Sequence, residues 1–183
     1  MRRPQGRVAA MPTLHAAAIT TPRLVLEPLT PGHAEEMAGV LADPGLYTHI
    51  GGEPPTAADL RRRYTAWAAG APDPGTSWCN WAVTAGGRAV GTVQATVEEH
   101  PGAETRAALA WITGAPWQGR GYAAEAARAL AQWLAGQGVH RLSAAVHPAN
   151  TASERIARAC GMRPTGRWEE GERIWERRTT APA

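Results

Sequence analysis

The sequence predicts one α/β domain in which helices are layered on a mixed sheet. With 183 residues and 44% hydrophobic side chains, the chain is long and apolar enough to bury one sizeable core. The expected elements run strand, two helices, three strands, helix, strand, helix and two strands, an order typical of a sheet covered by helices. Neither an internal repeat nor a linker to a second domain interrupts it.

The first elements are expected to be a strand and two helices. Apolar and polar side chains alternate weakly over residues 23–29, which indicates a strand. Thr30 then suits the N-cap of a helix whose first position is Pro31, because proline is favoured there. Thr56-x-x-Asp59 resembles a capping box and places the start of the second helix.

The remaining elements bring the expected total to about seven strands and about four helices. Residues 79–84 and 89–97 indicate two strands of a hairpin, because Gly86-Gly87 lies between them. Apolar patterning and turn residues then predict, in order, a strand over 107–112, a helix over 122–135, a strand over 142–146, a helix over 151–160 and strands over 163–169 and 173–179.

Residues 1–18 are expected to form a flexible tail, and residues 19–183 a single domain. Polar residues and prolines break up any apolar region near the N-terminus, which argues against a signal peptide. No apolar stretch reaches the length of a membrane span. Cys79 and Cys160 match neither a metal-site spacing nor a disulfide framework. We therefore expect a cytoplasmic protein with no membrane partner and no metal.

The composition excludes several kinds of chemistry. All 19 basic residues are arginine, so a P-loop lysine, a Schiff-base lysine and a pyridoxal phosphate attachment are ruled out. The net charge of +3 mildly favours anionic partners. Because no basic stripe is interleaved with aromatic residues, nucleic acid is not an expected partner.

The most informative segment is the glycine-rich turn between the strand 107–112 and the helix 122–135. Gly119-x-Gly121 in this position leaves backbone N–H groups free at a helix N-terminus. Those donors and the positive end of the helix dipole suit a phosphate group. The segment therefore predicts a site for a phosphate-bearing cofactor.

The pattern of this turn fits two kinds of cofactor, and the first is a dinucleotide. Gly119-x-Gly121-x-x-Ala124 matches a dinucleotide fingerprint, which requires an acidic residue about 20 positions later to hold the ribose. No Asp or Glu occurs between Glu125 and Glu154, so a dinucleotide-dependent oxidoreductase is the weaker reading. A turn needed only for packing is the third possibility.

Residues 118–123, Gln-Gly-Arg-Gly-Tyr-Ala, also fit the pattern Q/R-x-x-G-x-G/A, and the chain resembles the GNAT acetyltransferases there. A second segment, from Asn150-x-x-Ser153 to Gly161-Met162, is similar to another motif of that family, with Met162 where phenylalanine is usual. The resemblance extends from Pro22 to about Thr180, and residues 21–30 look like the RimJ/RimL branch. It implies the GNAT fold, a mixed, mostly antiparallel sheet with splayed central strands.

The resemblance implies acetyl-CoA as cofactor and assigns residues to it. Backbone N–H groups of the turn would hold the pyrophosphate, the end of the preceding strand would pair with the pantetheine, and two residues of the second motif would contact the same arm. The implied cofactor-binding residues are Trp111, Ile112, Thr113, Gln118, Gly119, Arg120, Gly121, Tyr122, Ala123, Asn150 and Ser153. Asn150 also suits a helix N-cap, and both roles can hold together.

The resemblance and the sequence also indicate candidate catalytic residues. Ser153 stands where the RimL-like branch has a serine near the sulfur, so its hydroxyl is expected to give a proton to the leaving thiolate. Residues 106–112 contain no carboxylate, and Glu104 is the nearest candidate on that side for the general base. Glu98, Glu99, His100 and His147 are alternatives. Neither cysteine has the setting of a nucleophile, which favours direct attack by the amine.

The implied function is transfer of an acetyl group from acetyl-CoA to a primary amine. The acceptor would be the N-terminal amine of a protein or peptide, or an amine on a small molecule such as an antibiotic. The enzyme would be a monomer or a homodimer. A non-catalytic acyl-CoA-binding module is the main alternative, because the tyrosine that many of these enzymes use as an acid is missing.

Overall fold

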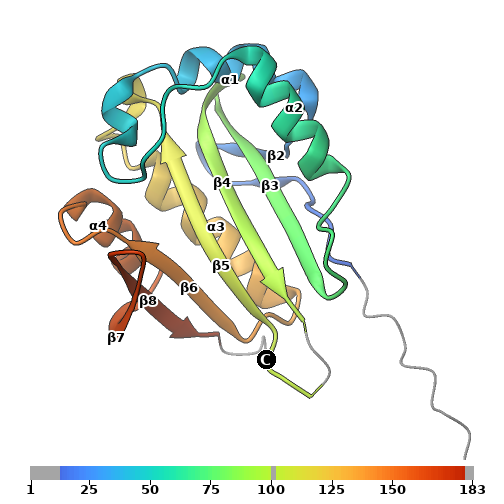
Figure 1. Ribbon diagram of the computed structural model, residues 1–183, viewed down its shortest axis with the longest axis vertical. Helices are drawn as coiled ribbons and strands as arrows, with labels where there is room; N and C mark the ends of the chain where they lie inside the picture. The colour runs from blue at the N-terminus through green and yellow to red at the C-terminus, as the bar shows by residue number, and fades with distance from the viewer. Residues whose placement is uncertain (1–12, 100–101, 180–183) are drawn as a thin grey trace, which may run out of the picture.

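The computed structural model describes residues 13–99 and 102–179, which form a twisted sheet with helices against it (Figure 1). The sheet has eight strands in the order β1-β2-β3-β4-β5-β6-β8-β7. They are β1 (Ile19–Thr20), β2 (Val25–Pro28), β3 (Thr76–Ala85), β4 (Arg88–Glu98), β5 (Arg106–Thr113), β6 (Arg141–Val146), β7 (Arg163–Glu169) and β8 (Glu172–Arg178). Within the described residues, only β5 and β6 pair in parallel, and all other neighbouring strands are antiparallel.

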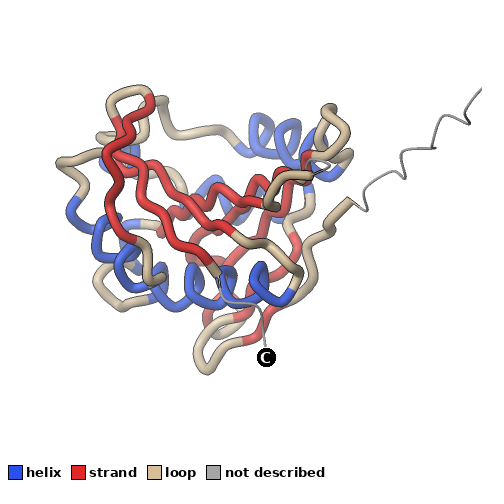
Figure 2. Tube along the Cα trace, turned by 90° about the horizontal axis from the view of Figure 1, so that it is seen from below, coloured by secondary structure: helices blue, strands red, loops and turns tan. Residues whose placement is uncertain are grey.

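Helices cover parts of both faces of the sheet, which Figure 2 shows from below. The α-helices are α1 (Ala34–Val40), α2 (Ala57–Ala68), α3 (Tyr122–Gly136) and α4 (Thr151–Ala159). Short 3₁₀ turns are η1 (Pro31–His33), η2 (Pro44–Tyr47) and η3 (Ala115–Trp117). The predicted α/β layering and mixed, mostly antiparallel sheet are therefore confirmed.

Two apolar clusters form the core, one on each face. The larger cluster joins α3 and α4 to the sheet, with Leu130, Leu134 and Leu142 among its fully buried side chains. The smaller cluster packs α1 and α2 against the other face around Met37 and Leu60. Because α1 and α2 lie over the β2–β4 side, the second face of β5, β6 and β8 is left uncovered (Figure 1).

The central strands separate, as the resemblance implied. Ladder pairing between β5 and β6 joins residues 106–108 to residues 141–143 and then stops. Beyond that point the two strands diverge (Figure 1), so their facing edges have no strand partner. This wedge opens towards the C-terminal ends of both strands, where the glycine-rich turn and α4 begin.

The N-terminal segment differs from the prediction. Residues 1–12 lie outside the described residues, but Leu14 N donates to Ser77 Oγ at 3.0 Å and Trp81 Nε1 donates to the carbonyl of Ala17 at 2.8 Å. Residues 14–17 are thus attached to β3, and β1 adds a two-residue strand that no sequence pattern marked. Two residues are too few to show an alternation of apolar and polar side chains.

Candidate functional site

A cavity of about 540 Å³ lies where the wedge, the glycine-rich turn and the start of α4 meet. It brings together ten of the eleven residues that the sequence assigned to the cofactor. These are Trp111, Ile112, Thr113, Gln118, Gly119, Gly121, Tyr122, Ala123, Asn150 and Ser153. Arg120 is the exception, since its side chain is exposed and does not line the cavity.

The glycine-rich turn presents a helix N-terminus to this cavity. Gly121 is the N-cap of α3 with φ 78°, and Gly119 has φ 75°, a left-handed conformation that favours glycine. The first helical hydrogen bond runs from Glu125 N to the carbonyl of Gly121 at 3.0 Å. The N–H groups of residues 122–124 therefore have no partner one turn earlier, and they lie at the positive end of the helix dipole.

An ion pair fixes this turn to the N-terminal end of β2. Glu125 accepts hydrogen bonds from Thr21 Oγ1 at 2.6 Å and from Arg23 N and Nε at 3.1 and 2.6 Å. Through Nη1, Arg23 also donates to the carbonyl of Arg120 at 2.9 Å, and its guanidinium lies 5.1 Å from the ring centroid of Tyr122. One side chain thus connects the helix, the turn and the sheet.

The charge state of Glu125 follows from these contacts. Burial by itself raises the pKa of this carboxyl, but the hydrogen bonds from Thr21 and Arg23 outweigh it. The pKa consequently lies below its usual value of 4.5. Glu125 is therefore ionised at neutral pH and supports the turn as a carboxylate.

Glu125→Gln should lower the free energy of unfolding at neutral pH by about 2 kcal/mol, because it removes a charged hydrogen-bond acceptor. A group with a depressed pKa in the folded state contributes stability above its unfolded pKa and loses it as the pH falls through its folded pKa. The difference from wild type should therefore shrink below about pH 4.5. Urea unfolding followed by circular dichroism at several pH values measures it, and a pH-independent difference would contradict the assignment.

Glu35→Gln is the matched control for this experiment. Glu35 pairs with Arg61 at 2.5 Å, but both side chains are largely exposed. Exposed ion pairs contribute about 0–1 kcal/mol, so this variant should unfold nearly as the wild type does.

The start of α4 supplies two further polar groups. Asn150 is the N-cap, and its Oδ1 accepts from Ser153 N at 3.0 Å, so the capping role is realised while the side chain also lines the cavity. Trp111 Nε1 donates to Ser153 Oγ at 3.3 Å. Because that bond uses a lone pair of the hydroxyl oxygen, the proton of Ser153 stays available for another acceptor.

A second cavity, of about 530 Å³, adjoins the first on the uncovered face of the sheet. The two share five lining residues, namely His49, Ile50, Trp111, Asn150 and Ser153. Away from this junction, the second cavity is lined by Gln94 and Thr96 of β4 and by Glu170 and Glu172 of the β7–β8 hairpin. Ser153 thus lies where a ligand in one cavity meets a ligand in the other.

Two histidines lie at this junction. The rings of His49 and His147 stack with centroids 5.1 Å apart and an angle of 23° between their planes. His147 Nδ1 accepts from Ala149 N at 3.2 Å. In the neutral ring, this bond places the proton on Nε2.

Glu104 does not lie at this junction, and its expected role as general base is corrected. It precedes β5 and is bonded to Arg141 at 3.2 Å and to Arg178. The hydrogen bond from Arg141 is the largest of the interactions that lower the pKa of this carboxyl. Trp111 lies seven residues further along β5, which corresponds to roughly 20 Å of extended chain. The arginines at the start of β6 and the end of β8 account for its position.

Sequence reasoning missed His49, Glu170 and Glu172. His49 lies in the connection between η2 and α2, and the two glutamates fall between the two last strands that the sequence predicts, over 163–169 and 173–179. The fold brings them to the junction, since β8 pairs with β6 up to Val146 and so places the hairpin beside His147. The sequence does show that the hairpin follows the second motif. The strand order is needed, however, to place the hairpin beside that motif.

Both cysteines are buried, and burial raises the pKa of Cys79 to about 12 and that of Cys160 to about 11. Thiols with such pKa values are protonated at neutral pH and are poor nucleophiles. Over residues 13–99 and 102–179, no group of three or more His, Cys, Asp or Glu side chains is placed to hold a metal ion. No helix within those ranges is long and apolar enough to cross a membrane.

Comparison with known proteins gives the following matches. A family model described as acetyltransferase (GNAT) domain matches residues 23–163. The GNAT-family acetyltransferase from Bacillus anthracis has a TM-score of 0.71 and 20% identity, covering 89% of this chain and 99% of that one. RimL, the ribosomal L7/L12 α-N-protein acetyltransferase in complex with coenzyme A, has a TM-score of 0.74 and 15% identity, with coverages of 91% and 100%.

Aminoglycoside acetyltransferase AAC(6′)-Ib, in complex with coenzyme A, has a TM-score of 0.68 and 18% identity, covering 85% of this chain and 94% of that one. No curated protein matches the chain in sequence. At these identities, the likeness to solved structures establishes the fold.

Proposed function

The chain belongs to the acetyltransferase (GNAT) domain family, and on that premise we propose that it transfers an acetyl group from acetyl-CoA to a primary amine. The observation that carries this proposal is the meeting of two cavities at Ser153. One cavity contains a helix N-terminus suited to phosphate, and the other contains carboxylates and imidazoles suited to an amine. Joined cavities of this kind allow two substrates to be held side by side.

The cofactor cavity fits coenzyme A in its chemistry. The free N–H groups at the start of α3 suit the pyrophosphate, and the unpaired edge of β5 at residues 111–113 offers backbone groups to the amides of the pantetheine. Arg155, which also lines the cavity, adds positive charge. Arg158, further along α4, lies 4.8 Å from the ring centroid of Trp175 and does not line the cavity. RimL and AAC(6′)-Ib were both solved with coenzyme A, which supports this choice.

Acetyl-CoA supplies the acetyl group as a thioester, which an amine can attack directly. The chain's own part is to hold the amine without its extra proton and to protonate the leaving sulfur. Ser153 Oγ, whose lone pair is engaged by Trp111, is placed to give its proton at the junction. On the acceptor side, the imidazole of His49 and the carboxylates of Glu170 and Glu172 are available to take the amine proton. His147 is not, because its Nδ1 accepts from Ala149 N and its Nε2 holds the ring proton.

The proposed acceptor is the N-terminal amine of a polypeptide or an amine of a small molecule. RimL is a protein N-acetyltransferase and AAC(6′)-Ib acts on aminoglycosides, so similar folds include both classes. Residues 21–30, which look like the RimJ/RimL branch, contain the Thr21 and Arg23 that hold Glu125.

Release of the coenzyme A thiol tests the proposal. Purified protein incubated with acetyl-CoA should release thiol faster when N-terminal peptides, polyamines or aminocyclitols are added, and the acceptor should gain one acetyl group in its mass spectrum. Thermal stabilisation by coenzyme A with no thiol release from any acceptor would favour a non-catalytic binding module instead. Stabilisation by NAD(P) but not by coenzyme A would favour the dinucleotide reading.

A further inference from the structure

We propose that the acceptor is an extended polypeptide, whose N-terminal amine lies at Ser153 and whose following residues run along the uncovered face of the sheet. This inference rests on the proposed function and names its acceptor class. It starts from a third cavity, of about 510 Å³, which continues the second cavity away from the junction at Ser153. The two cavities share Thr96, Ala108 and Ala145. We call them together the open-face groove.

The strand register explains the floor of this groove. Side chains alternate between the two faces of a sheet, and the buried members of β5 and β6, such as Leu109 and Leu142, point to the α3 side. The members in between are small, namely Ala108 of β5 and Ser143 and Ala145 of β6. Small side chains on three adjacent positions leave a shallow channel with larger groups on either side.

The groove is longer than a compact amine requires. A single cavity of about 530 Å³ lies within the range that holds a drug-sized ligand. The third cavity extends the groove from Ala145 to Arg141, four residues along β6, which is on the order of 13 Å. An extended peptide covers that length with about four residues. A chain acceptor therefore uses space that a small molecule leaves empty.

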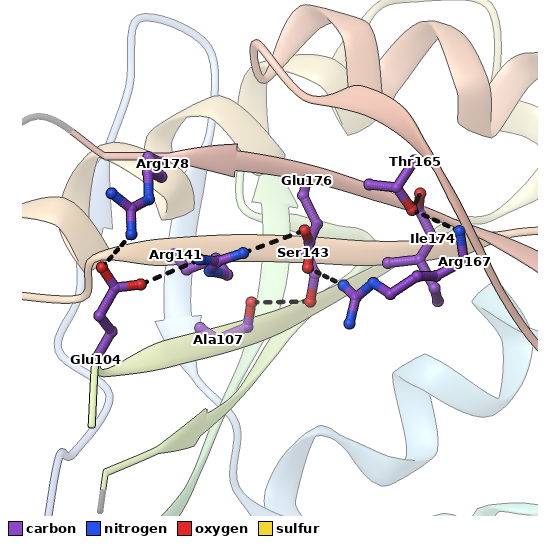
Figure 3. A network of polar contacts seen from close by, with 9 residues as sticks. All are labelled: Glu104, Ala107, Arg141, Ser143, Thr165, Arg167, Ile174, Glu176 and Arg178. Carbon is purple, nitrogen blue, oxygen red and sulfur yellow. Dashed lines mark hydrogen bonds and ion pairs between the residues drawn. The ribbon is translucent and has the colours of Figure 1, made fainter. Parts of the chain in front are cut away.

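An ion-pair network lines the far part of the groove, and Figure 3 shows it from close by. Arg141 lies between Glu104 and Glu176, at 3.2 and 3.5 Å. Glu176 also pairs with Arg167, and Glu104 with Arg178. Arg106 pairs with Glu98 at 2.7 Å. Each arginine that lines the groove is therefore paired with a glutamate.

The remaining charge of the groove is negative. Six glutamates and three arginines line its two cavities. Among the described residues, Glu169, Glu170 and Glu172 of the β7–β8 hairpin make none of the ion pairs. A segment with arginine or lysine near its N-terminus complements this charge, and opposite charges favour both encounter and register. We therefore assign the groove to a basic N-terminal segment.

Peptide acceptors of equal N-terminus and different length test the proposal. A dipeptide amide is compared with heptapeptides that begin with the same two residues and continue with arginine, with serine or with glutamate. We expect kcat/KM for the arginine heptapeptide to exceed that for the dipeptide amide by about tenfold, with the glutamate heptapeptide below the serine one. Equal values for all four acceptors, or faster turnover of a compact polyamine than of every peptide, would overturn it.

Two variants locate the effect in the groove. Ser143→Phe fills the floor of the third cavity and should reduce the ratio of kcat/KM for the long and short acceptors to near one. Glu169→Arg should lower the ratio between the arginine and glutamate heptapeptides. Asp73→Arg is the matched control, because Asp73 is exposed and lines neither cavity of the groove, and both ratios should stay at their wild-type values.

A binding measurement separates this inference from the proposed function. Fluorescence anisotropy of the labelled arginine heptapeptide, with coenzyme A present, reports occupancy of the groove without turnover. Binding of the peptide to the wild type that is weakened by Ser143→Phe would support the groove, even if no thiol is released. Absence of thiol release would reject acetyl transfer but not the groove. Absence of binding, or sedimentation showing a dimer in which a second copy covers this face, would overturn the proposal.

Discussion

Ala123→Asp should weaken coenzyme A binding by about 100-fold while leaving the fold intact. Ala123 is the second residue of α3, and its N–H is one of those available to a phosphate. A carboxylate there interacts well with the helix dipole, so the helix itself gains about 0.5 kcal/mol. The same carboxylate repels a pyrophosphate at short range by about 3 kcal/mol or more, which corresponds to the stated loss of affinity.

Ala58→Asp is the matched control, because Ala58 is the second residue of α2 and lies outside the cofactor cavity. Isothermal titration with coenzyme A and thermal unfolding of both variants make the comparison. Both should unfold at or above the wild-type temperature, and only Ala123→Asp should lose affinity. Equal affinity in the two variants would mean that the start of α3 does not hold the pyrophosphate.

Ser153→Ala should lower kcat by about 100-fold, the lower end of the range for general acid catalysis. The change removes the hydroxyl that Trp111 Nε1 contacts at 3.3 Å but leaves the backbone N–H that Asn150 caps. The melting temperature and the affinity for coenzyme A should therefore change little. Steady-state kinetics with acetyl-CoA and a peptide acceptor measure the effect.

Ser153→Cys provides the complementary variant, because a thiol keeps a proton donor at the same position. It should recover part of the rate lost in Ser153→Ala. A kcat for Ser153→Ala close to that of the wild type would remove this residue from the proton path. An unchanged kcat with a raised KM would indicate a binding role only.

The fold could be predicted because its signals are local. The apolar run 107–112, the glycine pair of the turn and the apolar stripe of α3 each define one element and its limits within a few residues. Their order along the chain then restricted the possible layering. β1 escaped prediction because its two residues carry no period and are ordered by pairing with β2.

The cofactor side of the site was accessible from sequence for the same reason, since residues 118–123 form one continuous turn. The acceptor side was not accessible, because it is assembled by strand order. His49 and Glu172 are far apart in sequence, and they line one cavity because β8 lies between β6 and β7 and places the hairpin there. Glu104 is close in sequence to β5, but it precedes the strand and lies at the end of β5 opposite to Trp111. Proximity along a strand is therefore a poor guide to a shared site.

Transfer of an isotopically labelled acetyl group tests the central claim most directly. Protein is incubated with labelled acetyl-CoA and the arginine heptapeptide, and the free thiol and the mass of the peptide are measured together. We predict label on the N-terminal amine in an amount equal to the thiol released, and loss of both signals in Ala123→Asp. Thiol release that is independent of the acceptor, or an unlabelled acceptor in every case, would contradict the assignment of this chain as an amine acetyltransferase.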